Sequence, residues 1–476
     1  MDLASVVKAY DVRGLVPDQL DAGVVRALGA AFAEVVVLPE AAAGARPSAV
    51  VGHDMRPSSP ELSRAFADGL ASRGVDVVLI GLCSTDGLYY ASGALGVPGA
   101  MFTASHNPAQ YNGIKLCRAG ARPVGQDTGL AAVRELAQRW LDAGEVPGTG
   151  AEPGAVSTRD VLADYAAHLR SLVDLSGARP LRVVVDAGNG MAGHTVPAVL
   201  GDAAGLPALP LAVEELYFEL DGTFPNHEAN PLDPENLRDL QAAVPRAGAD
   251  LGLAFDGDAD RCFVVDENGD PVSPSAVTAM VARREIAKER AAGRGAVVIH
   301  NLITSRAVPE IVAEDGGTPV RTRVGHSFIK QRMAEEDAVF GGEHSAHYYF
   351  RDFWSADTGM LAAMHVLAAL AESDRPLSEL AREYERYVSS GEVNSTVEDA
   401  AAVTDLVEQR FTATGDVDVD RLDGLTITSR SEPMWWFNLR ASNTEPLLRL
   451  NAEGADEATM VRVRDEVLAI VRGQEA

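Results

Sequence analysis

Cysteine is scarce in this chain, where Cys83, Cys117 and Cys262 stand far apart among 476 residues. No two of them form a CxxC pair, so the sequence argues against a disulfide framework and fits a reducing compartment better. The first residues lack the basic and then apolar pattern of a signal peptide, and no uninterrupted apolar run reaches membrane-spanning length. We therefore expect a cytoplasmic protein that does not bind membranes.

Basic residues are also in short supply. Lysine and arginine number 41 against 69 acidic residues, which gives a net charge of −28 and an isoelectric point of about 4.7. Such a charge disfavours nucleic acid and anionic membrane surfaces as partners. A phosphorylated ligand would need locally clustered arginines or a metal ion, and the plainest role of the acidity itself is solubility.

Strand-like and helix-like segments alternate in three successive regions, a pattern typical of α/β layers. With 46% hydrophobic and 23% charged residues, the chain is globular in composition and long enough for several domains. The predicted strands are 49–52, 75–80 and 99–102, then 181–185 and 251–255, then 296–299, 318–324 and 338–340. Predicted helices include 61–73 and 360–370.

The last part of the chain differs, because strands are predicted at 425–427 and 435–437 and a helix at 456–471. We expect an α/β protein with three similar mixed α/β domains and a smaller C-terminal α+β domain around a central cleft. The expected domains are 1–153, 154–268, 269–376 and 377–476. A glycine- and proline-rich linker at 144–153 ends the first of them.

Ser105 lies in the stretch T-A-S-H-N-P at 103–108, directly after the apolar run 99–102. Proline stops regular structure, so we expect Ser105 on an exposed loop at the carboxyl end of a strand. Open α/β sheets bind their ligands at that edge. A turn or capping serine is the plain alternative for this motif taken alone.

A second polar stretch, D-G-D-A-D-R at 256–261, follows the predicted strand 251–255. Alternating Asp256, Asp258 and Asp260 can point three carboxylates to one centre, which suits Mg²⁺. A calcium EF-hand would need glycine in place of Arg261, and an aspartyl phosphotransferase loop would need D-x-D-x-T. On spacing alone, a solvated acidic turn remains an alternative.

A glycine motif, G-N-G-M-A-G at 188–193, fits G-x-G-x-x-G after the predicted strand 181–185. Glu214 and Glu215 follow about twenty residues later, as in dinucleotide-binding units. A nucleotide-dependent oxidoreductase is therefore one candidate function. A lone glycine fingerprint is weak, however, and a structural turn is the alternative that we favour.

The motifs at 103–108 and 256–261 together resemble the α-D-phosphohexomutase family, the phosphomannomutase/phosphoglucomutase enzymes. The resemblance continues in family order through Y-D-V-R-G at 10–14, Y-N-G-I-K at 111–115, V-G-H at 324–326, G-E-H-S-A-H at 342–347 and R-A-S-N-T-E-P at 440–446. Residues 186–193 likewise resemble a structural turn of the family's second domain. The resemblance thus covers essentially the whole chain.

The resemblance implies a role for each matching residue. Ser105 would carry a phosphoryl group and, with Asp256, Asp258 and Asp260, bind one Mg²⁺ per chain. The implied catalytic residues are Ser105, Arg13, His106, Lys115, Arg261 and His326. Lys115, with a lowered pKa, and His326 are the candidates for proton transfer. The implied substrate-binding residues are Tyr10, Gly325, Glu343, Ser345, His347, Arg440, Ser442, Asn443, Thr444 and Arg449.

The resemblance also implies an activity, the interconversion of hexose 1-phosphate and 6-phosphate through a phosphoserine and a hexose 1,6-bisphosphate. Mannose and glucose phosphates are the expected substrates, and a phosphoglucosamine mutase is an open alternative. A non-catalytic sugar-phosphate-binding relative is another, although an intact Ser105 argues against it. We expect sugar phosphates as the only partners and a monomer or weak dimer.

Overall fold

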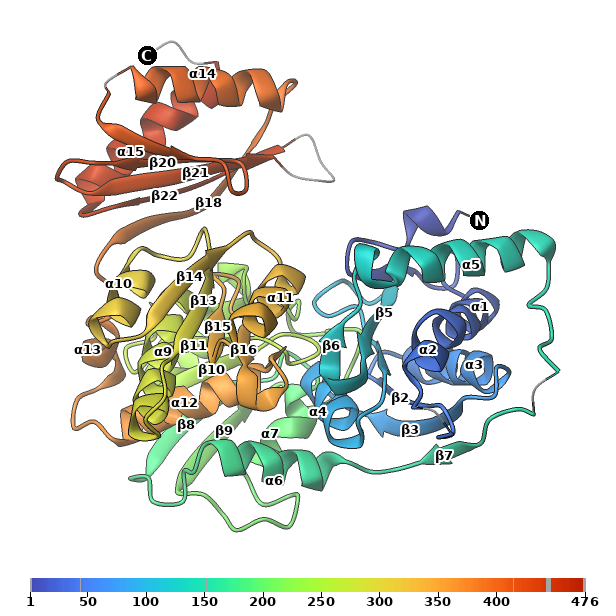
Figure 1. The fold of residues 1–476 in the computed structure, drawn as a ribbon. Helices are drawn as coiled ribbons and strands as arrows, with labels where there is room; N and C mark the ends of the chain where they lie inside the picture. Colours follow the sequence, from blue (N-terminus) through green and yellow to red (C-terminus); the bar gives the residue numbers. More distant parts are fainter. Residues whose placement is uncertain (1, 43, 151, 414, 442–446, 474–476) are drawn as a thin grey trace. The chain divides into compact units, whose positions relative to one another are not determined.

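The computed structural model describes residues 2–42, 44–150, 152–413, 415–441 and 447–473, without the side chains of residues 326 and 327. The chain divides into two compact units, drawn element by element in Figure 1. The first unit comprises Met1–Val272 and Ser345–Leu380, and the second comprises Ser273–His344 and Ala381–Ala476. One boundary therefore falls inside the predicted sugar loop at 342–347.

The first sheet of the first unit has the strand order β1-β5-β4-β2-β3-β7, with β6 paired to β5. Strand β2 is parallel to β3 and β4, and β5 is antiparallel to β1 and β4. Helices α1 and α3 cover one face and α4 the other (Figure 1). The strands are β1 (Asp11–Leu15), β2 (Ser48–His53), β3 (Asp76–Leu82), β4 (Gly99–Phe102), β5 (Tyr111–Arg118), β6 (Arg122–Pro123) and β7 (Val156–Thr158). The helices are α1 (Ala22–Phe32), α2 (Leu38–Glu40), α3 (Ser59–Ala71), α4 (Thr85–Leu95) and α5 (Leu130–Ala143).

Helix α1 continues without a break into a π-helical turn and α2, so one helical run spans Ala22–Glu40. By length and composition this helical run could cross a membrane. Arg26 and Glu34 interrupt its apolar sequence, so the expectation that no uninterrupted apolar run reaches this length is not contradicted. Here most of the run is buried in the core against α3. A Cβ on Gly29 would lie 2.3 Å from the Phe66 carbonyl oxygen, so glycine permits the close approach of the two helices.

The second sheet of the first unit has the order β12-β11-β10-β8-β9. Strands β10 and β11 are buried along their whole length, and the acidic stretch 256–261 joins them. The hairpin β16–β17 and helix α12 also belong to this unit, and Arg261 makes an isolated β-bridge to His347. The elements are β8 (Leu181–Asp186), β9 (Leu211–Leu216), β10 (Leu251–Phe255), β11 (Cys262–Asp266), β12 (Pro271–Val272), β16 (Tyr348–Phe350), β17 (Ala356–Asp357), α6 (Leu162–Leu172), α7 (Ala192–Val199), α8 (Arg238–Ala247), α12 (Gly359–Ala371) and α13 (Leu377–Ala381).

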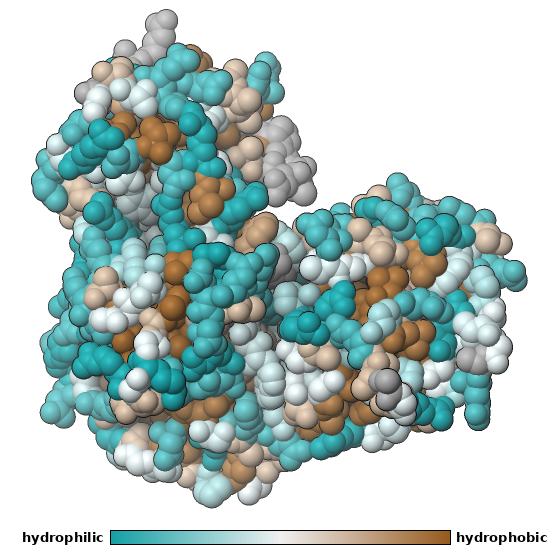
Figure 2. Space-filling view, in the orientation of Figure 1, coloured by the Kyte–Doolittle hydropathy of each residue, from teal (hydrophilic) through white to brown (hydrophobic). Residues whose placement is uncertain are grey.

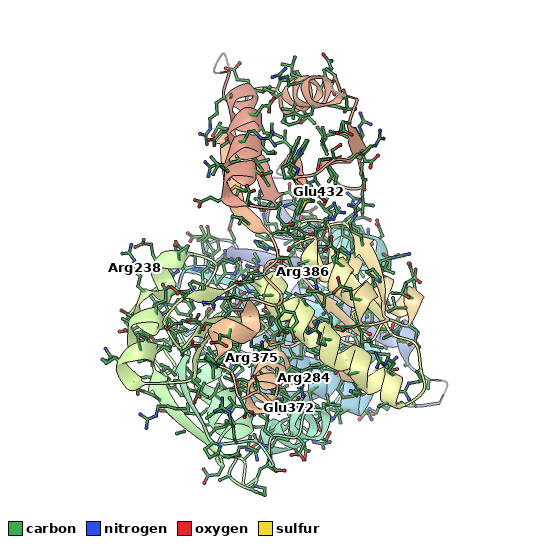
Figure 3. All side chains as sticks on the ribbon, turned by 90° about the vertical axis from the view of Figure 1, so that its left-hand side faces the viewer. Arg238, Arg284, Glu372, Arg375, Arg386 and Glu432 are labelled. Carbon is green, nitrogen blue, oxygen red and sulfur yellow. The ribbon has the colours of Figure 1, made fainter. Side chains whose placement is uncertain are left out.

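The second unit holds three parallel strands in the order β14-β13-β15, accompanied by α9, α10 and α11. These elements are β13 (Val297–Asn301), β14 (Thr318–Thr322), β15 (Phe340–Gly342), α9 (Pro274–Ala291), α10 (Ala307–Glu314) and α11 (His326–Glu336). Arg386, labelled in Figure 3, donates to both carboxylate oxygens of Glu314 at 2.7 and 2.6 Å. The segment that leads to the last sheet is thereby fastened to α10.

The last sheet is antiparallel, with the order β18-β22-β21-β20-β19, and α14 and α15 lie on one of its faces (Figure 1). Its core is built from Phe437, Leu439 and Leu450 on the strands and Val463 and Val467 on α15. The elements are β18 (Val388–Thr396), β19 (Val417–Asp420), β20 (Leu425–Ser429), β21 (Trp435–Ala441), β22 (Leu447–Gly454), α14 (Ala400–Thr412) and α15 (Glu457–Val471).

The structure confirms the predicted fold class. Each predicted strand is present with its ends within two residues of the prediction, except that β21 runs four residues beyond the predicted 435–437. Apolar runs mark buried strands well and their ends less well. The four-domain boundaries stay a prediction. Figure 2 shows hydrophilic residues interspersed with small apolar areas on the face drawn, as the charged composition suggests.

Candidate active site

Ser105 lies just beyond the carboxyl end of β4, as predicted from the apolar run before it. Its hydroxyl donates a 2.8 Å hydrogen bond to Asp256 Oδ2, across 151 residues of sequence. The expected exposure is wrong, because only 4% of Ser105 is exposed. The acidic stretch packs directly over it: a Cβ on Gly257 would lie 2.4 Å from the Ser105 carbonyl oxygen.

The backbone of Ser105 is held in the left-handed region, with φ of 51°. A non-glycine residue adopts this conformation only when its surroundings determine it. Thr103 Oγ1 accepts from the Ser105 N–H at 2.9 Å. Arg56 donates to four carbonyl oxygens of the loop and its exit, those of Ser105, Asn107, Pro108 and Tyr111. The loop is thus fixed before any ligand binds.

Arg56 was missed by the sequence reasoning, and it is one of the best-buried residues, at 1% exposed. Its guanidinium pairs with the fully buried Asp54 at 3.2 Å. Both residues follow strand β2. In the sequence, Asp-x-Arg after a buried strand is only a weak indication of a functional residue. The contact with the serine loop, which the structure shows, is what identifies the role of Arg56. A planar, five-donor group is the natural clamp for several carbonyl oxygens at once.

Asp256, Asp258 and Asp260 form an acidic triad, in which one carboxylate oxygen from each residue lies within 4.8 Å of the other two. All three residues are at most 1% exposed, and Oδ1 of Asp258 and of Asp260 accept no hydrogen bond. Burying unpaired carboxylate oxygens is costly unless a cation meets them. The triad therefore fits a metal ion, and hard oxygen donors suit Mg²⁺ or Mn²⁺.

The neighbouring side chains shift the acidity of the triad in different directions. Burial raises the pKa of Asp256 against the opposing effect of Arg261, and the other two carboxylates add to the rise. For Asp258, burial is outweighed by Lys115 and by hydrogen bonds from Lys115 and Thr85, so its pKa is lowered. The pKa values of Asp256 and Asp258 thus shift in opposite directions although the two residues share one loop.

Lys115, on β5, points into the triad. Its Nζ lies 2.6 Å from Asp258 Oδ2 and 2.5 Å from Asp260 Oδ2. Burial alone would lower its pKa, but the two carboxylates more than reverse this, so the pKa is raised. The expected lowered pKa is therefore wrong, because Lys115 pairs with two carboxylates, whereas a pocket lined by cations was expected from the sequence.

Arg261 connects Asp256, Ser105 and His106. It donates to Asp256 Oδ2 from Nε at 3.0 Å and from Nη2 at 2.7 Å, and Nη2 lies 3.5 Å from Ser105 Oγ. Nη2 also lies 2.6 Å from His106 Nδ1. Burial, Arg261 and Arg13 lower the pKa of His106 to about 3, so its ring is neutral and Nδ1 accepts. Arg13, on β1, donates to the Ala104 carbonyl oxygen of the serine loop at 3.2 Å.

The predicted sugar loop is shared between the two units. In the first unit, Ser345 Oγ lies 3.0 Å from His347 Nδ1, and His347 Nε2 lies 3.8 Å from Asp260 Oδ1. The structure thus brings this half of the loop to the acidic triad. In the second unit, the buried Glu343 accepts from Asn301 Nδ2 at 3.1 Å and from the Gly325 N–H at 3.4 Å.

The predicted phosphate site also lies in the second unit. Arg440 on β21 and Arg449 on β22 face each other directly in the sheet register. Like charges directly opposite are unfavourable. Glu392 lies near both arginines, at 3.9 and 3.5 Å, and Asp423 Oδ2 lies 3.6 Å from Arg440 Nη1. The two guanidinium groups are thus close enough to bind one anion together. Ser442, Asn443 and Thr444 lie outside the described residues.

Two further predicted residues are placed only in part. His326 begins helix α11, but its side chain is outside the described part of the structure. Tyr10 is half-buried and precedes β1, on the same segment as Arg13. Their proposed roles stay predictions.

The glycine motif at 188–193 proves to be a turn that supports the acidic stretch. The Met191 N–H donates to the Gly257 carbonyl oxygen at 2.9 Å, and a Cβ on Gly190 would lie 2.7 Å from that oxygen. A Cβ on Gly193 would lie 2.2 Å from the Phe218 carbonyl oxygen. Protein backbone occupies the space that a dinucleotide phosphate would need, so the oxidoreductase alternative is not favoured.

Comparison with known proteins gives one result along the whole chain. Four family models match in order: "Phosphoglucomutase/phosphomannomutase, alpha/beta/alpha domain I" at 4–141, domain II at 163–269, domain III at 273–387 and the C-terminal domain at 392–470. A protein of Xanthomonas campestris pv. campestris named "Phosphohexose mutases" is 40% identical over 471 residues, 98% of this chain and 99% of that protein. The "Phosphomannomutase" of Escherichia coli (strain K12) is 38% identical over 465 residues, 97% of each chain.

A crystal structure gives the same picture. The "Phosphoglucomutase/phosphomannomutase family protein" of Burkholderia thailandensis has a TM-score of 0.85 and 32% sequence identity to this chain. The match covers 100% of this chain and 98% of that chain. Sequence and structure comparisons therefore agree over all four matched segments.

Proposed function

The chain belongs to the phosphoglucomutase/phosphomannomutase family and is an intramolecular phosphotransferase, and we propose that it interconverts the 1- and 6-phosphates of mannose and/or glucose through phosphorylated Ser105. The observation that carries the proposal is the position of Ser105 Oγ, 2.8 Å from Asp256 Oδ2 and 3.5 Å from Arg261 Nη2. A fixed hydroxyl between a carboxylate and a guanidinium is suited to receive and release a phosphoryl group. The names of the relatives support mannose and glucose.

In the proposed reaction, a hydroxyl of the bound sugar monophosphate attacks the phosphorus of phosphorylated Ser105. The new O–P bond forms as the Ser105 Oγ–P bond breaks; the attacking hydroxyl gives up its proton, and Oγ keeps the electron pair of the broken bond and ends with one proton, so that the proton count is unchanged. Arg261 and Arg13 flank the position of the transferring group and neutralise its charge. The bisphosphate then turns, and its other phosphate returns to Ser105.

The remaining residues position charges and protons. We assign Asp256, Asp258 and Asp260 to one Mg²⁺, which would supply positive charge to the transferring phosphoryl group when bound. Lys115 is held as a cation by its carboxylate partners and adds charge, which leaves His326 as the proposed proton acceptor. We further propose a cytoplasmic monomer or weak dimer with sugar phosphates as its only partners.

A coupled assay tests the proposed function directly. Purified enzyme with Mg²⁺ and a trace of hexose 1,6-bisphosphate is given mannose, glucose or glucosamine 1-phosphate, and formation of each 6-phosphate is followed. Turnover of the mannose or glucose compound supports the proposal. Turnover of the glucosamine compound alone favours the phosphoglucosamine mutase, and no turnover of any of the three contradicts the proposed activity.

Glu343 is proposed to read sugar hydroxyls without taking part in the chemistry. Glu343→Ala removes a buried acceptor, so KM should rise roughly 10- to 100-fold for every sugar whose hydroxyls it meets, as expected for hydrogen bonds to a charged group. Phosphorylation of Ser105 by a bisphosphate donor in a single turnover should persist. Asn301→Ala is a matched control, because it removes one hydrogen-bond partner of Glu343 while leaving the carboxylate. Steady-state constants unchanged in Glu343→Ala would refute the assignment.

Arg449 is proposed to bind whichever substrate phosphate is not reacting. One anion site must then serve both the 1-phosphate and the 6-phosphate, since substrate and product bind in opposite orientations. Arg449→Ala should raise KM for both by similar factors, roughly 10- to 100-fold, and release more free bisphosphate. Initial rates in both directions measure this, with the exposed Arg430→Ala of the same sheet as the control. A defect limited to one direction would contradict a shared site.

A further inference from the structure

The amino end of helix α4 lies directly against the acidic triad. The first helical residue, Thr85, follows the N-cap Ser84, and its backbone N–H donates to the Asp258 carbonyl oxygen at 3.0 Å. Its hydroxyl donates to Asp258 Oδ2 at 2.5 Å. Thr85 and Asp258 are both 0% exposed, so no solvent competes for either bond. Thr85 therefore donates two hydrogen bonds to Asp258, a residue of the proposed metal site.

We infer that Thr85 is a positioning residue for the metal: it fixes which oxygen of Asp258 faces the cation. This inference rests on the proposed Mg²⁺ site. Asp258 Oδ2 accepts from both Thr85 Oγ1 and Lys115 Nζ, whereas Oδ1 is buried without a hydrogen bond. A carboxylate saturated on one oxygen presents the other, and partners of this kind orient ligands and tune metal affinity.

The position of Thr85 is itself firmly determined. The next residue, Asp86, is fully buried and accepts 2.7 Å hydrogen bonds from Tyr165 on α6 and from Thr358, the N-cap of α12. The start of α4 is thereby tied to two other helices of the same unit. The positive end of the helix dipole also faces the Asp258 side of the triad, which favours its charged form. Because Thr85 is itself held in place, its hydrogen bonds can fix the orientation of the Asp258 carboxylate.

The test is a direct measurement of metal binding, without substrate or turnover. Thr85→Val keeps the branched shape and the backbone N–H but removes the hydroxyl. Titration calorimetry or electron paramagnetic resonance with Mn²⁺ should give a dissociation constant roughly 10- to 100-fold higher than in the parent enzyme. Thr85→Ser restores the hydroxyl and should restore the parent value. Thr85→Ala gives a second measurement of the lost hydroxyl if the valine variant does not fold.

Thr278→Val is the matched control, since Thr278 is equally buried and its hydroxyl donates to the Pro274 carbonyl oxygen instead of the triad or Asp86. It should leave the Mn²⁺ dissociation constant within about threefold. An unchanged constant in both Thr85→Val and Thr85→Ala, or an equal weakening in Thr278→Val, overturns the role of Thr85. Absence of Mn²⁺ binding by the parent enzyme would overturn the metal site itself, a result distinguishable from the failure of Thr85 alone.

Discussion

Replacing Ser105 by alanine should lower mutase turnover on the order of 10⁴-fold or more, because the variant lacks the oxygen that carries the phosphoryl group. The fold should survive, since the backbone of the serine loop is held by Arg56 and Thr103 and not by the Ser105 hydroxyl. Alanine must adopt the left-handed backbone seen here, which costs about as much as it does for serine. Loss of activity should therefore exceed loss of stability.

Two measurements decide this prediction. The coupled assay gives the turnover, and mass spectrometry of enzyme incubated with hexose 1,6-bisphosphate should place phosphate on the peptide that holds Ser105. Ser63→Ala is the control, since Ser63 is a buried serine of the same unit that bonds only to the Pro60 carbonyl oxygen among its described partners. Near-normal turnover of Ser105→Ala in the presence of metal would remove the basis of the proposed mechanism.

Features that depend on neighbouring residues in the sequence were predictable. Short apolar runs identified most of the buried strands, and polar residues directly after them identified the loops that carry Ser105 and the acidic triad. Packing over those loops was not predictable from the same pattern. Ser105 was expected to be exposed, yet Gly257 lies against its carbonyl oxygen because a loop from the second sheet closes over it.

The features that the sequence did not predict depend on contacts between residues that are far apart in the chain. Arg56 and Ser105 are 49 positions apart, and Thr85 and Asp258 are 173 apart, so no local pattern links either pair. The pKa of Lys115 could not be predicted for the same reason. Burial lowers this pKa and nearby carboxylates raise it, so the direction of the shift depends on the short distances to Asp258 and Asp260. The position of Glu392 near both Arg440 and Arg449 likewise depends on how three strands pair in the sheet, which the sequence does not show.

Replacing Asp258 by asparagine should lower activity roughly 10²- to 10³-fold, as the loss of a charged group beside the transferring phosphoryl group does in other enzymes. The Mg²⁺ concentration for half-maximal activity should rise as well. Stability without metal should change little, because the variant loses an ion pair with Lys115 but also the repulsion from two neighbouring carboxylates. The effect of Asp258→Asn on the protein should therefore appear when metal is bound and be small without it.

Thermal unfolding with and without Mg²⁺ separates these contributions. A metal that binds only the folded protein raises its stability in proportion to the logarithm of its concentration over its dissociation constant. The parent enzyme should therefore gain thermal stability with Mg²⁺, and Asp258→Asn should gain much less. Asp186→Asn is the matched control: Asp186 is equally buried in the same sheet but pairs with His227 and the Gly188 N–H. It should lose stability yet keep the full response to Mg²⁺. An undiminished Mg²⁺ response in Asp258→Asn, or activity indifferent to exhaustive chelation in the parent, would show that the triad serves the fold and not a metal.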